Sequence, residues 1–212
     1  MAPPPFSMYS PKGPGDDGAA DVTAGLAPVY GAGPDDDPGY LASLRGGTVL
    51  GRLRAVMLVL LAAPVLILAI TPLIVDEGDG GRAGDGGPWP YLVLAVLALP
   101  ALLAGPRTPR PMPPGGTRGD AAGRALLLFR QAVLLRFALP LGVVLAGLPL
   151  AMVGHGELIF VAGFAAGYPL LAGLALPTRG GVERIRRRLE AHGAESHLWA
   201  VLLAPQPGPD DR

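Results

Sequence analysis

Apolar residues gather into four long blocks along the chain, and the segments between the blocks are rich in Gly, Pro and charged residues. A helix needs about 20 apolar residues to cross a bilayer core of ~30 Å, and the first block has that length. The pattern predicts an all-α protein whose centre is a four-helix transmembrane bundle. The expected helices cover residues 53–75, 88–104, 126–153 and 157–177.

The second and third blocks depart from this length in opposite directions. The second is short, which implies local thinning of the bilayer or little tilt, and Trp89 and Tyr91 at its start suit the headgroup level. The third is longer than one crossing and carries Arg130 and Arg136 in its first half. We expect this helix to begin in the cytoplasm or headgroups and to enter lipid near Ala132, with Arg136 extending back to the phosphates.

The third and fourth blocks are joined by only three residues, Gly154, His155 and Gly156. A connection this short makes the two helices antiparallel neighbours. The fourth block contains Gly163 and Gly167 in a GxxxG pattern, which lets two helix backbones approach closely. We therefore expect these two glycines to lie at a helix contact.

The first segment, residues 1–50, differs from the bundle in composition. It contains few large aliphatic side chains and the acidic run of Asp35, Asp36 and Asp37. A segment of this kind cannot bury enough surface to offset its ordering entropy. We expect a disordered cytoplasmic tail ahead of a transmembrane domain that covers residues 51–177.

The last segment, residues 178–212, is a second tail with a helical signal. Val182, Ile185 and Leu189 recur at the spacing of a narrow apolar helix face, among several arginines. This spacing predicts a short basic amphipathic helix, which suits the cytoplasmic headgroup region.

Arginine alternates in density between successive flanks of the blocks. It is abundant before the first block, between the second and third, and after the fourth; the first loop has Arg82 alone, and the turn between the third and fourth blocks has neither Arg nor Lys. Because basic flanks stay in the cytoplasm, the alternation predicts a multi-pass protein of the plasma membrane with both termini inside.

The sequence contains no catalytic or cofactor signature. It has no Cys, which excludes disulfides, Cys-based zinc sites and thiol catalysis. Its 17 basic and 17 acidic residues cancel, so net charge gives no support for a nucleic-acid partner. No phosphate-binding loop, metalloprotease or hydrolase motif occurs in its required context, and His155 with Glu157 makes an incomplete metal site. We expect a protein that is not an enzyme and that holds no cofactor or metal.

The arginines near the predicted helix ends are the candidates for contact with lipid or a partner, because charge in hydrocarbon is expensive. They are Arg130, Arg136, Arg184, Arg186, Arg187 and Arg188. The leading hypothesis is a non-enzymatic membrane protein that acts by helix packing with lipids, anionic headgroups included, or with a membrane-protein partner or a second copy. The alternative is a small transporter or permease subunit, based on prolines in every predicted helix and polar residues on the third.

Two stretches carry a resemblance to a known group. The segments FRQAVLLRFALP and PTRGGVERIRRRLEAHGAESHLWAVLLAP resemble uncharacterised multi-pass membrane proteins of actinobacteria. The resemblance covers residues 124–205 and leaves out the first tail. It implies a membrane location and carries no implied activity.

Overall fold

The computed structural model describes residues 26–75 and 87–206, and these residues form an all-α structure. Its single-turn 3-10 helices are η1 (Pro34–Asp36) and η3 (Gly105–Arg107). Its α-helices are α2 (Tyr40–Ser43), α3 (Val49–Ile74), α4 (Trp89–Ala104), α5 (Arg118–Gly154), α6 (Glu157–Ala175), α7 (Arg179–Leu189) and α8 (Leu198–Leu202).

Three of the described helices, α3, α5 and α6, are long and apolar enough to cross a membrane, and α4 is a shorter apolar helix of 16 residues. Large aliphatic side chains remain exposed along α3 and α4, such as Leu73 at 85% and Val96 at 63%. Exposed apolar surface on this scale is typical of helices that face lipid.

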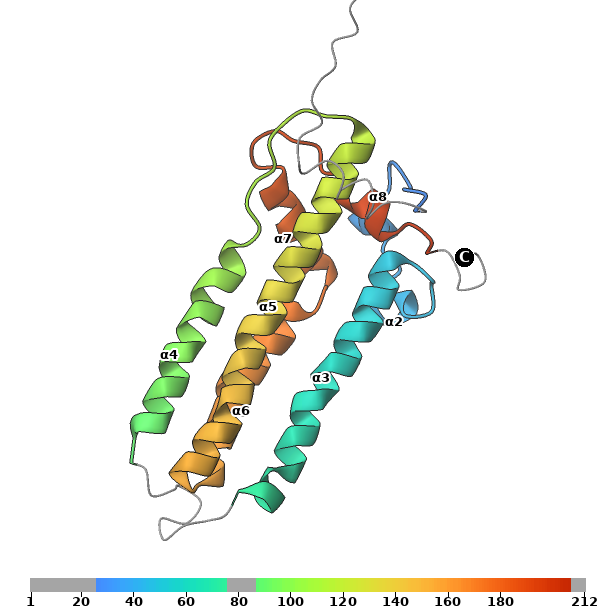
Figure 1. The fold of residues 1–212 in the computed structure, drawn as a ribbon. Helices are drawn as coiled ribbons and strands as arrows, with labels where there is room; N and C mark the ends of the chain where they lie inside the picture. The colour runs from blue at the N-terminus through green and yellow to red at the C-terminus, as the bar shows by residue number, and fades with distance from the viewer. Residues whose placement is uncertain (1–25, 76–86, 207–212) are drawn as a thin grey trace, which may run out of the picture.

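The helices α5 and α6 run antiparallel and form the centre of the bundle, with α4 and α3 on opposite sides of them (Figure 1). α6 contacts each of the other three long helices. A left-handed residue, His155 at φ 49°, ends α5 and lets the chain reverse directly into α6. The structure agrees with the predicted antiparallel pair.

The helix starts follow from threonine caps. Thr48 Oγ1 accepts a hydrogen bond from Gly51 N at the start of α3, and Thr117 Oγ1 accepts one from Asp120 N at the start of α5. Both helices therefore begin before their apolar blocks, at residues 49 and 118, whereas the hydrophobic pattern placed these starts at 53 and 126. Capping, and not hydropathy, sets the helix start.

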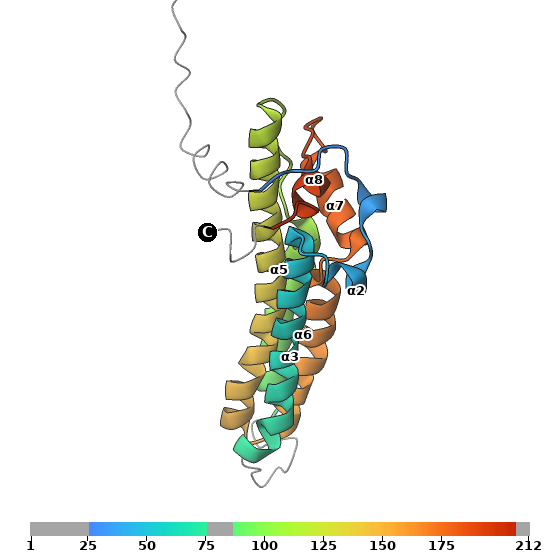
Figure 2. The same ribbon diagram turned by 90° about the vertical axis from the view of Figure 1, so that its right-hand side faces the viewer.

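Beyond the ends of α4 and α6, the first half of α5 carries a second layer, which we call the cap (Figure 2). The cap consists of residues 26–48, residues 108–135, α7 and α8. Its core includes Leu126, Phe129, Leu189 and Trp199, each no more than 2% exposed, and Leu50 of α3 packs with them. Such a core resembles that of a small soluble domain seated on the bundle.

The cap includes residues that the sequence assigned to a disordered tail. From Leu26 onward the chain follows a defined path: Val29 N donates to Ala200 O at 2.9 Å, and Leu26 packs against the cap core. The expectation of disorder is therefore corrected for residues 26–48, because the partners that order this segment come from α3 and α8. Residues 1–25 lie outside the described residues.

Gly163 and Gly167 lie on the face of α6 that packs against α5. A Cβ at Gly167 would come within 2.7 Å of Val144 Cγ2 and 2.8 Å of the Pro140 carbonyl oxygen. At Gly163 it would meet Gly147 Cα at 3.2 Å. The two helix backbones approach so closely here that no side chain fits between them.

We predict that Gly167→Ala lowers the free energy of unfolding by about 1–3 kcal/mol, because backbone atoms of α5 must move to admit the methyl group. The matched control is Gly173→Ala on the same helix, where an added Cβ meets nothing within 4 Å. Thermal unfolding in detergent measures both. Equal midpoints for the two variants would contradict the assigned contact.

Candidate functional site

Two arginines, Arg54 and Arg136, are buried where the cap meets the bundle; they are 1% and 8% exposed, respectively. Burying a guanidinium is costly unless its donors are hydrogen-bonded. Arg54 donates from all three of its nitrogens to oxygens of other segments, and Arg136 donates from Nε and Nη2 to carbonyls beyond the end of α4. They therefore fix where the long helices stop relative to one another.

Arg54 joins three separate segments of the chain. Its Nη1 and Nη2 donate to the two carboxylate oxygens of Asp37 at 2.8 and 2.7 Å, and its Nε donates to the Pro177 carbonyl at 3.0 Å. Ser43 Oγ accepts from Nη1 at 2.8 Å, and the ring of Tyr40 lies 5.0 Å from the guanidinium carbon. This arrangement attaches residues 37–43 to α3 and to the linker between α6 and α7.

Arg136 is held by backbone carbonyls at the end of α4. Its Nε donates to Gly105 O at 2.9 Å, and its Nη2 donates to Thr108 O at 2.6 Å. The sequence placed Arg136 in contact with lipid phosphates, reached by an extended side chain. In the structure two of its donors are used inside the protein, so the guanidinium is fixed in position.

The spacing along α5 places Arg136 at one boundary of the bundle. At about 1.5 Å per residue, it lies about 27 Å from Gly154 at the far end, close to the ~30 Å of a bilayer core. The first half of α5, from Arg118 to Arg136, extends beyond this level and packs in the cap. The entry of this helix into lipid near Ala132 stays a prediction.

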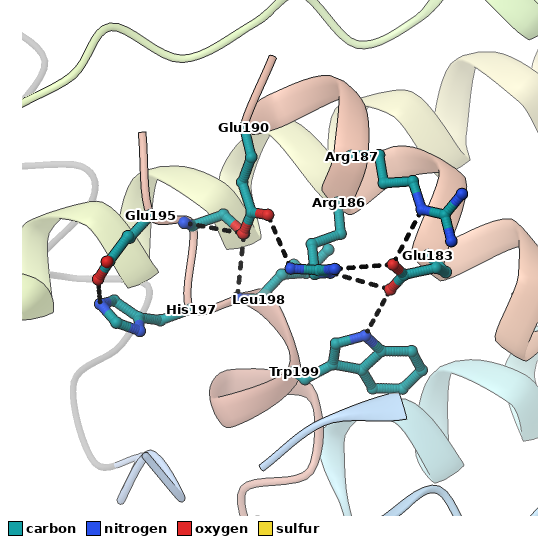
Figure 3. Close-up of polar contacts among 9 residues, drawn as sticks. Glu183, Arg186, Arg187, Glu190, Glu195, His197, Leu198 and Trp199 are labelled. Carbon is teal, nitrogen blue, oxygen red and sulfur yellow. Dashed lines mark hydrogen bonds and ion pairs between the residues drawn. The ribbon is translucent and has the colours of Figure 1, made fainter. Parts of the chain in front are cut away.

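The helix α7 divides its charges between two faces. On the face toward α8, Glu183 accepts hydrogen bonds from Arg186, Arg187 and Trp199, and Arg186 Nη1 also donates to Glu190 at 2.7 Å (Figure 3). Glu190 in turn accepts from Ser196 Oγ at 2.7 Å. Every charge on this face has a partner of opposite sign or a polar neighbour.

These hydrogen bonds shift the titration of the groups involved. The Arg186 guanidinium, helped by Trp199 and Arg187, lowers the pKa of Glu183 from 4.5 to about 2. The same pair raises the pKa of Arg186. Hydrogen bonds from Arg54 likewise lower the pKa of Asp37 below its ordinary 3.8. All of these groups are therefore charged at neutral pH, and the cap is held in part by ion pairs.

The other face of α7 adjoins a cavity of about 200 Å³ between α5, the end of α6 and α7. Arg136, Arg184 and Arg188 line it, together with apolar residues that include Phe129 and Leu174. Among the described residues, none that lines the cavity is acidic. We call this space the basic cavity, and it is the candidate functional site.

Arg130 lies on a different side of the protein, in a groove between α3 and α5. Arg52 lines the same groove and donates to Gln206 Oε1 at 3.2 Å. Phe129 forms part of the wall of both the groove and the basic cavity. The six arginines singled out from the sequence are thus distributed over three environments: the basic cavity, the paired face of α7 and this groove.

The sequence did not identify Arg54 or Asp37 as important. In the sequence, Arg54 is one of the arginines that flank the first block and indicate membrane orientation, and Asp37 belongs to the acidic run of the first segment. A usable signal was present: Arg54 is the second residue of the first apolar block, where an arginine needs a partner. The identity of that partner depends on a contact between residues 17 positions apart that no local pattern encodes.

No protein-family model matches this sequence, and no curated protein and no solved structure is significantly similar to it. The suspected likeness to actinobacterial membrane proteins therefore gains no support beyond the three long apolar helices. Within the described residues, no group of three or more His, Asp or Glu side chains is arranged to hold a metal ion.

We predict that Asp37→Asn lowers the free energy of unfolding by about 3 kcal/mol or more, because it leaves the buried charge of Arg54 without a counter-ion. Asp35→Asn is the matched control. Asp35 is 91% exposed and pairs with Arg179 at the surface, so its loss changes stability by about 1 kcal/mol or less. Thermal unfolding in detergent compares them, and similar effects of the two changes would refute the role assigned to Asp37.

Proposed function

We propose that this protein is a non-enzymatic, four-pass protein of the plasma membrane that binds anionic lipid headgroups through its cap. In this proposal α3, α4, α5 and α6 cross the bilayer, and the cap lies on the cytoplasmic leaflet. The 16-residue α4 is about 24 Å long, which is shorter than the ~30 Å bilayer core. It therefore crosses with little tilt or where the bilayer is locally thinned.

The cytoplasmic assignment of the cap is supported by where arginine lies. The cap end of the bundle carries Arg52, Arg54 and Arg136 as well as the five arginines of residues 179–188. The opposite end has the turn at His155, which contains neither Arg nor Lys. Basic residues that flank membrane helices remain in the cytoplasm, so both termini lie inside.

The basic cavity is the observation on which the lipid-binding proposal rests. Three guanidinium groups line one cavity whose described lining is free of acid, at the level where α4 and α6 end. This is the level of the headgroups if the bundle spans the membrane. Each basic group near an anionic leaflet contributes about 1 kcal/mol to attraction.

A transport role is the alternative, favoured by prolines inside each long helix: Pro64 and Pro72 in α3, Pro100 in α4, Pro140 and Pro149 in α5, and Pro169 in α6. Such prolines leave carbonyls without a helical partner, and these can coordinate a solute. Solute flux into reconstituted vesicles that changes on substitution of Arg130 or Arg136 would favour this alternative.

We predict that a thiol at His155 faces outward and a thiol at His192 faces the cytoplasm. The natural chain has no cysteine, so His155→Cys and His192→Cys each create a single reactive site. A membrane-impermeant maleimide applied to right-side-out vesicles is expected to label only the first, and permeabilisation is expected to expose the second. Labelling of both sites, or only of His192→Cys, before permeabilisation would overturn the topology.

We predict that Arg184→Gln combined with Arg188→Gln reduces the anionic phospholipid that remains bound after purification in uncharged detergent. The double variant removes two charges from the basic cavity. Native mass spectrometry counts the bound lipids, with zwitterionic phospholipid as the reference species. Arg187→Gln is the control, because Arg187 is also exposed but is paired with Glu183 at 3.1 Å. An equal loss in the control, or none in the double variant, would count against the proposal.

A further inference from the structure

We infer that the basic cavity accepts a phosphate monoester, a terminal phosphate group that carries close to two negative charges. The inference rests on the proposed function in placing the cavity at the headgroup level, and it goes further by naming the class of anion. It follows from the number of charges, from the way Arg136 is held, and from the size of the cavity.

Three cations line the cavity, and they repel one another. Arg184 and Arg188 are four residues apart on α7, a spacing at which like charges destabilise a helix. The carboxylates nearest in sequence, Glu183 and Glu190, are hydrogen-bonded to Arg186 on the other face. A phosphodiester would supply about one negative charge, whereas a monoester supplies about 1.5 to 2 at neutral pH and offsets more of the repulsion.

The guanidinium of Arg136 is already fixed in position in the absence of a ligand. Gly105 O and Thr108 O fix its Nε and Nη2, while its Nη1 makes no hydrogen bond to any described residue. A guanidinium whose plane is already fixed loses little entropy when it binds phosphate. Arg188 likewise has no hydrogen bond or ion pair within the described part of the chain, and Arg184 makes one, to Gly180 O.

The size of the cavity suits a small anion. Its volume of about 200 Å³ holds a phosphate group and a short polar stem, since one water needs about 10–15 Å³ by the same measure. Apolar side chains, among them Phe129, Leu174 and Ile185, form the rest of the wall. This mixture fits the phosphate and first carbons of a lipid headgroup or of a free phosphate ester.

Among the described residues, the charged side chains that line the cavity are all arginines, on α5 and α7, and the lining part of α6, Gly173–Ala175, is uncharged. Glu183, with a pKa of about 2, stays ionised, as does Asp37, whose pKa is lowered by Arg54. A monoester has a second pKa near 6, so any change of affinity in this range comes from the ligand.

The experiment titrates the full-length protein, in uncharged detergent, with three probes by isothermal calorimetry: dioctanoyl phosphatidic acid, dioctanoyl phosphatidylglycerol and glycerol 3-phosphate. At pH 7.5 we expect the first, a lipid monoester, to bind about fivefold or more tighter than the second, a lipid diester, for one added charge interaction of about 1 kcal/mol. At pH 5.5 that preference should shrink, while the affinity for the diester stays constant.

The variants identify the cavity as the binding site. Arg184→Gln and Arg188→Gln should each weaken binding of the monoester by about fivefold, and Arg187→Gln should leave it unchanged. Arg136→Gln should weaken it more, because Arg136 is buried. Should Arg136→Gln fail to fold, the two exposed positions still decide the question.

The possible outcomes separate this inference from the proposed function. Equal, pH-independent affinity for diester and monoester would overturn the inference and leave anionic-lipid binding in place. Tight binding of glycerol 3-phosphate without a contribution from lipid would support a monoester site but assign it to a soluble ligand, against the proposed function. Absence of binding, or binding that ignores Arg184 and Arg188, would overturn the inference.

Discussion

The structure depends on how two guanidinium groups are satisfied at the level where the long helices end. Arg54 and Arg136 are each buried, and each donates to a backbone carbonyl just beyond the end of a long helix: Pro177 O after α6 and Gly105 O after α4, respectively. A helix end leaves carbonyls without partners, and a buried arginine has donors that need acceptors. Here the arginine donors bind carbonyls next to the helix ends. Arg136 therefore holds the end of α4 against α5, and Arg54 holds the end of α6 against α3.

This constraint explains why the molecule has two layers. Below the two arginines, the helices expose aliphatic side chains over most of their outer surface, whereas above them Leu126, Phe129 and Trp199 form a closed apolar core. In lipid, exposed aliphatic side chains need no second layer of protein to cover them. The cap, which is rich in charge, must instead bury its apolar side chains as a soluble domain does.

Local patterns predicted the parts that depend on local physics. Hydropathy located the four long helices, and the spacing of Val182, Ile185 and Leu189 predicted α7, whose three apolar residues are all buried. The pairing of Glu183 with Arg187 also follows from helical spacing and is present at 3.1 Å. In contrast, the order of residues 26–48 depends on the contact between Asp37 and Arg54. Composition favoured disorder because it reflects only the small number of aliphatic side chains and contains no information about this tertiary contact.

The candidate site could be predicted only in part for the same reason. The arginines were evident in the sequence, but their division into paired and unpaired sets depends on which face of α7 meets α8. Ser196 and Trp199 arrive at one face and hold Glu190 and Glu183 there, and this leaves Arg184 and Arg188 on the side of the cavity. The segregation of acid from base on a single helix therefore results from tertiary packing.

The two buried arginines also connect the cap to the cavity. Pro177 forms part of the cavity wall, and its carbonyl accepts the hydrogen bond from Arg54. Arg136 enters the cavity from α5 while Gly105 holds it at the end of α4. Because both walls are fixed by groups outside the cavity, its three cations remain close together although they repel one another. The ion pair of Asp37 with Arg54 thus helps to maintain a concentration of positive charge that it does not itself touch.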